Sequence, residues 1–218
     1  VWSDTNESKA GSLPYMTRYR GELAWMREGR ERKILSLYGE DMLDITDRLA
    51  ITLGLRYDDY DDMGGHLSPR GAAVWRLTDH HILKAQYSEA FRPPTFSELH
   101  SQTNGLIAGN AELESEHIRT AELGYIFRNP ITTLRVTLFH SELKDNIEHP
   151  ATSSKDSDPD DIRYVNGGDI RMKGLELEFE QKLGKAFRLE GNLSFAETED
   201  SDTGASVEGS ADWLGNMG

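Results

Sequence analysis

Carboxylates are the side chains that the sequence gathers most densely, and they raise the first chemical question. Two acidic groups lie in polar segments: Asp156, Asp158, Asp160 and Asp161, and further on Glu197, Glu199, Asp200 and Asp202. Oxygen ligands at this density could hold calcium. Their spacing, however, lacks the glycine and the terminal glutamate of an EF-hand loop, so we favour the alternative of solvated acidic loops.

Signatures of catalysis are absent from the sequence. The chain has no cysteine, no Gly-x-Ser-x-Gly turn, no Gly-rich phosphate loop and no His-Glu-x-x-His zinc motif. The formal net charge of -14 argues against a nucleic-acid partner, because nucleic-acid phosphates would be repelled. We therefore expect no catalytic residues and no cofactor, and we do not expect an enzyme.

A hydrophobic period of two runs through most of the chain and predicts β-strands. Between Leu49 and Asp58, apolar side chains alternate with small or polar ones, which is typical of a strand with one apolar face. The same period recurs in Tyr15–Met26, Lys33–Leu43, Arg70–Leu77, Ile82–Phe91, Thr120–Phe127, Thr133–His140, Tyr164–Leu183 and Phe187–Ala196. Several of these strands approach the ~9–11 residues that a tilted strand needs to cross a bilayer.

Short and long connections alternate between the predicted strands. Short turns are expected at 44–48, 78–81, 129–131 and 184–185. Longer polar links are expected at 27–32, 59–68, 92–119, 143–163 and everywhere after Glu197. Short turns at one rim and long loops at the other are typical of outer-membrane barrels, whose long loops lie outside the cell.

The two faces of the predicted strands differ strongly in polarity. One alternate face is almost wholly apolar, whereas the other carries charged side chains: Arg18, Arg20, Glu22, Arg56, Lys84, Glu122, Arg135, Glu176, Glu178, Glu180, Arg188 and Glu190. This pattern predicts an all-β fold, an antiparallel transmembrane β-barrel with lipid on one face and water on the other. The alternative is a soluble antiparallel sandwich or closed barrel, which would have to bury the apolar faces against a second layer.

Several motifs, in order, resemble one known family from Ser36 to Ala196. The most specific is Tyr87-Ser88-Glu89-Ala90-Phe91-Arg92-Pro93-Pro94-Thr95-Phe96-Ser97-Glu98-Leu99, followed by Gly109-Asn110-Ala111-Glu112-Leu113 and Glu122-Leu123-Gly124-Tyr125. Weaker matches are Gly54-Leu55-Arg56-Tyr57-Asp58, Ser68-Pro69-Arg70, Phe139 to Ile147, and Tyr164-Val165-Asn166 with Lys173 to Glu178. The run resembles the barrel of TonB-dependent outer-membrane receptors. Ala111 and Ser115 stand where the family usually has proline.

The resemblance implies a receptor that binds a scarce nutrient at the cell outer membrane and imports it with TonB-coupled energy. The implied ligand is a ferric siderophore, heme or cobalamin. Implied partners are outer-membrane lipid and, through a plug domain, the TonB–ExbB–ExbD complex. Because family barrels are expected to have 22 strands, we interpret residues 1–218 as part of one barrel domain, without the plug and terminal strands. A non-gated porin or structural barrel is the alternative.

Candidate ligand contacts lie in the loop after the Phe91-Arg92-Pro93-Pro94 run, because loops on a rigid scaffold commonly carry recognition. They are Arg92, His100, Gln102 and Asn104. Heme receptors of the family have a histidine between the two corresponding motifs, and a neutral imidazole can ligate heme iron. His100 is therefore a candidate heme ligand, although we favour the alternative of a solvated loop histidine.

Overall fold

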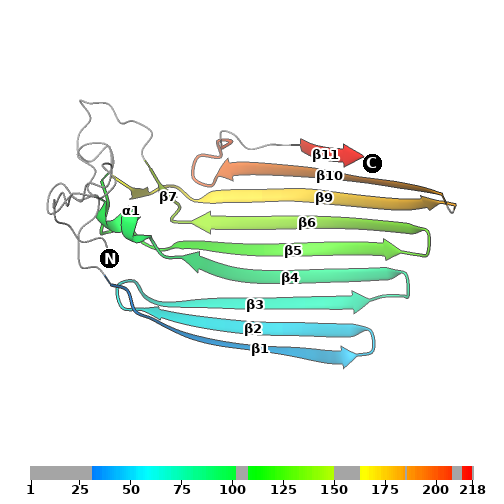
Figure 1. The fold of residues 1–218 in the computed structure, drawn as a ribbon, viewed down its shortest axis with the longest axis horizontal. Coiled ribbons are helices and arrows are strands. Elements are labelled where there is room, and N and C mark those ends of the chain that lie inside the picture. The colour runs from blue at the N-terminus through cyan, green and yellow to red at the C-terminus, as the bar shows by residue number, and fades with distance from the viewer. Residues whose placement is uncertain (1–30, 102–107, 150–162, 185, 208–212, 218) are drawn as a thin grey trace, which may run out of the picture.

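The computed structural model describes residues 31–101, 108–149, 163–184, 186–207 and 213–217. Nine strands form one antiparallel sheet in the order β1-β2-β3-β4-β5-β6-β9-β10-β11 (Figure 1). Their bounds are β1 Ile34–Thr46, β2 Leu49–Tyr60, β3 Gly64–Arg76, β4 His81–Arg92, β5 Glu116–Arg128, β6 Thr132–Lys144, β9 Ile170–Leu183, β10 Phe187–Asp200 and β11 Trp213–Met217. A two-residue pair, β7 Ile147–Glu148 with β8 Val165–Asn166, and one short helix, α1 Phe96–His100, complete the described elements.

The connections sort to two ends of the sheet. Tight turns join β1 to β2, β3 to β4, β5 to β6 and β9 to β10 at one end, which we call the turn end. The opposite end, the loop end, carries α1, β7 and the longer links (Figure 1). The prediction of alternating short and long connections is confirmed at the links that contain α1 and β7.

Three predicted boundaries are wrong. The link expected at 59–68 is a tight turn, because β2 continues to Tyr60 and β3 begins at Gly64, whose φ of 77° the missing side chain permits. The single strand expected over Tyr164–Leu183 is divided into β8 and β9. The polar link expected after Glu197 contains the end of β10 and then β11. The strand expected over Tyr15–Met26 lies outside the described residues.

Strand register confirms that one face of the sheet is apolar and the other polar. Cross-strand partners bring to one side, the apolar face, Leu53, Leu83, Leu123, Leu138, Leu177 and Leu193. They bring to the opposite side, the polar face, Arg56, Lys84, Glu122, Arg135, Glu178 and Glu190. Of the predicted polar-face residues, Arg18, Arg20 and Glu22 lie outside the described part of the chain.

The loop-end edge of the apolar face slopes across the sheet. On β10 the side chains of this face change from Phe195 to Glu197, and on β2 they change from Tyr57 to Asp59. These two changes do not lie in the same register row. The cross-strand partners that follow from Glu197 lead to Leu53 on β2, by way of Lys173, His140, Ala121, Tyr87 and Gly71. The edge thus moves six residues along β2 over six strand spacings.

That slope agrees with the tilt of strands in a membrane barrel. A rise of about 3.4 Å per residue and a spacing of about 4.8 Å between strands convert it to an angle of about 35°. Strands of outer-membrane barrels tilt by about 35–45°. Tyr57 and Tyr87 lie at this edge, where aromatic girdles of such barrels meet the headgroups. The edge is therefore where a flat hydrocarbon boundary would cross tilted strands.

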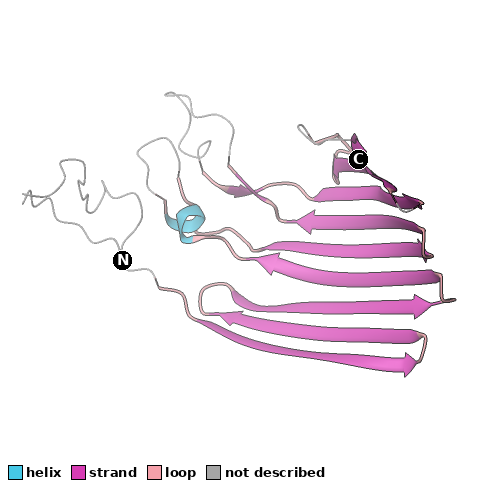
Figure 2. Cartoon of the chain, turned by 45° about the vertical axis from the view of Figure 1, so that its right-hand side comes forward, coloured by secondary structure: helices cyan, strands magenta, loops and turns pink. Residues whose placement is uncertain are grey.

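Little of the described chain is buried, and what is buried gathers at the loop end. Pro94, Leu99 and Leu113 are the buried apolar side chains of the described residues, whereas Leu53 is 55% exposed. Figure 2 shows one layer of strands with α1 beside its loop end. Within the described ranges, no helix is long and apolar enough to cross a membrane. Within those ranges no second layer of secondary structure covers the apolar face, as the soluble-sandwich alternative would require.

Arginine substitutions on neighbouring residues of β2 test the assignment of the two faces. Leu53→Arg places a charge in the middle of the apolar face and should cost about 2–4 kcal/mol, whereas Thr52→Arg on the polar face should cost less than about 1 kcal/mol. The free energy of unfolding is measured by urea titration of the full-length protein in phospholipid vesicles. Equal costs at the two positions would contradict the assignment.

Candidate functional site

Helix α1 is placed at the loop end by the proline-rich end of β4. Pro93 and Pro94 have no backbone N–H, so the strand ladder stops at Arg92. Thr95 then caps the helix: its side chain accepts a 3.2 Å hydrogen bond from the Glu98 backbone N–H, and its own N–H donates at 2.6 Å to the Glu98 carboxylate. This reciprocal capping box starts a helix in a segment too short to be stable alone.

Arg92 joins the helix to the sheet through two carboxylates. Its Nη1 lies 3.0 Å from Glu98 Oε2, and its Nε donates to Glu116 at the start of β5. The second oxygen of Glu116 accepts the Ile147 backbone N–H at 2.7 Å, which attaches β7 to the same centre. One guanidinium therefore fixes the relative positions of α1, β5 and β7.

Glu98 is held in its charged form. Partial burial raises the pKa of Glu98, but the hydrogen bonds from Thr95 and the charge of Arg92 outweigh that effect and leave its pKa below the usual value. The group therefore stabilises the docked helix above the carboxyl pKa of the unfolded chain. That contribution is lost as the pH falls through the lowered pKa of the folded state.

The segment that returns from α1 to β5 lies directly against the helix end. Gly109 donates its N–H to Ser101 O at 2.9 Å, and Asn110 donates to Glu98 O at 2.8 Å. A Cβ at Gly109 would lie 2.5 Å from the backbone nitrogens of His100 and Ser101, so only glycine fits without displacing the segment. The Gly-Asn pair of this motif thus serves the close approach of two chain segments.

Asn166 on β8 fastens two further segments. Its Oδ1 accepts the Glu114 N–H at 2.8 Å, and its Nδ2 donates to Glu114 O at 3.1 Å and to Asp145 O at 2.7 Å. Asn110 acts similarly, since its Nδ2 donates to Tyr164 O at 3.0 Å. The two asparagines connect the link after β4 with the link after β6, so the described loop segments form one connected unit.

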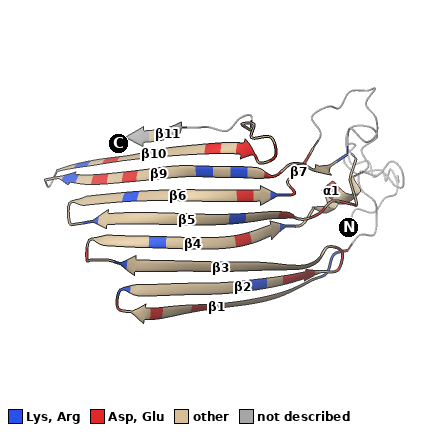
Figure 3. Ribbon diagram, turned by 180° about the vertical axis from the view of Figure 1, so that it is seen from behind, with Lys and Arg blue, Asp and Glu red and all other residues tan. Residues whose placement is uncertain are grey.

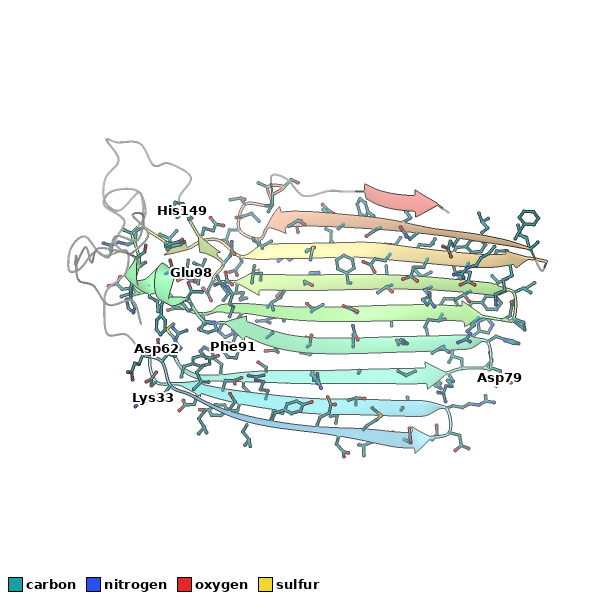
Figure 4. The ribbon with its side chains drawn as sticks, in the orientation of Figure 1. Lys33, Asp62, Asp79, Phe91, Glu98 and His149 are labelled. Atoms are coloured by element: carbon teal, nitrogen blue, oxygen red, sulfur yellow. The ribbon has the colours of Figure 1, made fainter. Side chains whose placement is uncertain are left out.

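Aromatic and imidazole rings gather where β3 and β4 separate. The two strands pair from Arg70 to Arg76 only, and Pro69, which lacks an N–H, lies at the end of that pairing. Beyond it, the ring of His66 stacks on that of Phe91 with centroids 4.2 Å apart. Figure 4 labels Phe91 near the loop end of the sheet. The complete ring cluster comprises Tyr60, His66, Phe91 and His117.

Arg32 connects the ring cluster to the helix. Its guanidinium carbon lies 5.6 Å from the centre of the Tyr60 ring and 5.1 Å from that of Phe96 in α1, while its charge pairs with Asp62 at 2.8 Å. At these distances the negative faces of both rings attract the guanidinium through cation–π interactions. The loop end thus offers rings and paired cations, an arrangement suited to binding a ligand rather than to covalent chemistry.

The structure places two of the four predicted ligand-contact residues. Arg92 lies at the end of β4 with its charge engaged by Glu98 and Glu116, and the His100 ring stacks on Phe96 at 6.3 Å. Gln102 and Asn104 lie outside the described residues, as do the predicted calcium ligands Asp156, Asp158, Asp160 and Asp161. Within the described ranges, no three histidine or carboxylate side chains converge as a metal site would require.

The second acidic group is not the solvated loop that its sequence predicts. Glu197 and Glu199 belong to β10 and lie 3.2 Å and 3.3 Å from Lys173 and Arg171, while Asp200 accepts hydrogen bonds in the following turn. Cross-strand cations therefore neutralise two of these carboxylates. Sequence reasoning also missed the roles of Glu98 and Glu116, although the Thr95-x-x-Glu98 spacing is a capping-box signature.

A spin label on α1 tests the role of Glu98. The chain has no native cysteine, so Ser97→Cys in the full-length protein provides a single labelling site within this chain. We expect a slow nitroxide spectrum at pH 7 that becomes mobile as the pH falls through the lowered pKa of Glu98, where the carboxylate gains a proton. In Glu98→Gln the label should already be mobile at pH 7. An unchanged pH profile in that variant would contradict the assignment.

Comparison with known proteins gives the same architecture. The family model described as "TonB dependent receptor-like, beta-barrel" matches residues 2–218. The chain is similar in fold to the crystal structure of the siderophore receptor PirA from Pseudomonas aeruginosa, with a TM-score of 0.69 and 26% sequence identity. The match covers 77% of this chain and 32% of the PirA chain.

Two curated relatives point the same way. A probable TonB-dependent siderophore receptor, PirA of Acinetobacter baumannii, is 32% identical over 56% of this chain and 18% of its own length. The ferrienterobactin receptor of Escherichia coli is 24% identical over 79% of this chain and 25% of its own length. The chain thus spans a third or less of each of these proteins. It belongs to the TonB-dependent receptor family, as a portion of the β-barrel with which these outer-membrane receptors cross the lipid.

Proposed function

We propose that the protein containing this chain is an outer-membrane receptor that binds a ferric siderophore and imports it with TonB-coupled energy. The observation that carries the proposal is the family match over residues 2–218, together with relatives named as siderophore receptors, two of them for ferric enterobactin. The family comprises transport receptors rather than enzymes. It also favours a gated receptor over the alternative of a non-gated porin.

The geometry of the loop end supports a binding role. A receptor must hold its outer loops in a defined arrangement if ligand binding is not to incur a large ordering cost. Arg92, Asn110 and Asn166 provide such an arrangement through contacts between segments that are distant in sequence. Arg92 then acts mainly as a positioning residue, while His100, Gln102 and Asn104 stay proposed ligand contacts.

Heme and cobalamin receive less support than a siderophore. The named relatives quoted above are siderophore receptors, and the His100 ring is stacked on Phe96 in the last turn of α1. We further propose that residues 1–218 form part of a single barrel domain, and that coupling to TonB–ExbB–ExbD runs through a plug domain of the same protein. Outer-membrane lipid is the proposed partner of the apolar face.

Uptake measurements in whole cells test the proposal. Cells that produce the full-length protein should bind radioactive ferric enterobactin saturably and accumulate it, and deletion of TonB should abolish accumulation while leaving surface binding intact. Hemin should cause no Soret shift in the purified protein. TonB-independent entry would instead indicate a porin, and a Soret shift lost in His100→Ala would assign a heme ligand.

A further inference from the structure

Strands β3 and β4 part before they reach the loop end. Their pairing extends only as far as Arg70 and Ser88, although β3 begins at Gly64 and β4 ends at Arg92. Figure 2 shows the two ribbons moving apart in that direction. Paired strands normally lie about 4.8 Å apart and are joined by backbone hydrogen bonds. Beyond Arg70, contacts across this part of the wall must therefore come from side chains.

Two imidazole rings meet across the gap. The His66 ring on β3 stacks on Phe91 of β4, and its centre lies 5.5 Å from the centre of the His117 ring on β5. Phe91 is the direct cross-strand partner of His117, and their ring centres are 6.4 Å apart. Histidines from β3 and β5, two strands that do not pair with each other, are thus brought together over one phenylalanine.

The His66 ring is held in place by polar contacts as well as by stacking. Its Nε2 lies 3.4 Å from the hydroxyl of the buried Ser115, and the backbone of Met63 accepts a hydrogen bond from the ring. An imidazole that gives one N–H to a backbone carbonyl keeps its other nitrogen as a ligand, the usual state of a metal-binding histidine. His66 is half-buried and His117 is exposed, so water reaches the space between them.

The charges around the two rings do not oppose a cation. Three arginines lie nearby, and each is already paired with carboxylates: Arg32 with Asp62, Arg56 with Asp58, and Arg92 with both Glu98 and Glu116. Figure 3 shows blue and red segments next to each other near the loop end of β2, where the second of these pairs lies. Four carboxylates therefore outweigh three guanidinium groups, and a positive ion is favoured by its surroundings.

We propose that His66 and His117 bind one divalent transition-metal ion, Zn²⁺ or Cu²⁺, and so join β3 to β5 across the gap. Imidazole nitrogen suits these ions, whereas Ca²⁺ and Mg²⁺ prefer oxygen ligands. In the described residues no third histidine or carboxylate joins the pair, which excludes a closed site there and leaves the remaining positions to water. The site does not involve the siderophore, so its test is independent of the proposed function.

Packing alone would respond differently to substitution. His66→Phe keeps a flat ring on Phe91 but removes both ring nitrogens, so it separates the two roles of His66. If the rings only fill the gap, Zn²⁺ should have no effect on either protein. If the pair binds a metal, Zn²⁺ should slow amide hydrogen exchange at residues 65–68 in the unchanged protein and leave it unaltered in His66→Phe.

Electron paramagnetic resonance of Cu²⁺ added to the full-length protein in detergent micelles tests the proposal. We expect one bound ion whose spectrum shows coupling to two imidazole nitrogens, and Zn²⁺ should displace it whereas Mg²⁺ should not. His66→Phe and His117→Gln should each weaken its binding at least about tenfold, since even changes in the groups around metal ligands cost that much. His117→Gln alters an exposed position and keeps the test available if His66→Phe does not fold.

A matched control separates this site from other histidines. His80→Gln/His81→Gln removes two imidazoles at the turn end, where they contact Arg128 O and the Tyr125 hydroxyl, and should leave the two-nitrogen Cu²⁺ signal unchanged. Equal Cu²⁺ binding by the unchanged protein and by the variants at His66 and His117 would overturn the proposal. So would an equal loss in the control, or hydrogen exchange at residues 65–68 that Zn²⁺ does not slow.

Discussion

The contact of one sheet face with hydrocarbon is the constraint on which the rest of the structure depends. A single layer of strands cannot bury an apolar face within itself, and the apolar side chains that the described chain buries, Pro94, Leu99 and Leu113, lie at its loop end. The exposed leucines therefore need a partner that this sheet does not supply, and we propose that this partner is the hydrocarbon of the outer membrane. The edge of the apolar face slopes by about 35° across the sheet, from Asp59 on β2 to Glu197 on β10. If the strands tilt by the same angle, as strands of outer-membrane barrels do, this edge lies in one flat plane.

The loop end follows from the same constraint. Backbone beyond the hydrocarbon is free to leave the sheet, and there the chain uses side chains in place of strand ladders to hold its links. Arg92 connects α1, β5 and β7, and Asn166 connects the links after β4 and β6. Three of the motifs that resemble the receptor family, at Phe91–Leu99, Gly109–Leu113 and Tyr164–Asn166, thus hold segments of the loop end together.

Sequence patterning predicted the strands well and the loop contacts poorly. Alternation placed β2 within two residues because each side chain of Leu49–Asp58 meets either lipid or water. It failed at Gly64, where a tight turn replaces the expected long loop. It also failed at Glu197 and Glu199, because charged residues on the apolar side of β10 interrupt the alternation and give the polar composition expected of a loop. The partners of Arg92 and Asn110 could not be predicted, because Glu116 and Tyr164 lie 24 and 54 residues away.

Depth measurements with nitroxide labels test the central claim most directly. Labels are placed singly at Leu53, Asp59 and Glu197 in the full-length protein in vesicles, and depth is obtained from the ratio of oxygen to nickel-complex collision rates. The tilted wall predicts that Asp59 and Glu197 lie at the same shallow depth and that Leu53 lies deep in the hydrocarbon. Because Leu53 and Glu197 share one row of the sheet, equal depths for those two would contradict the account.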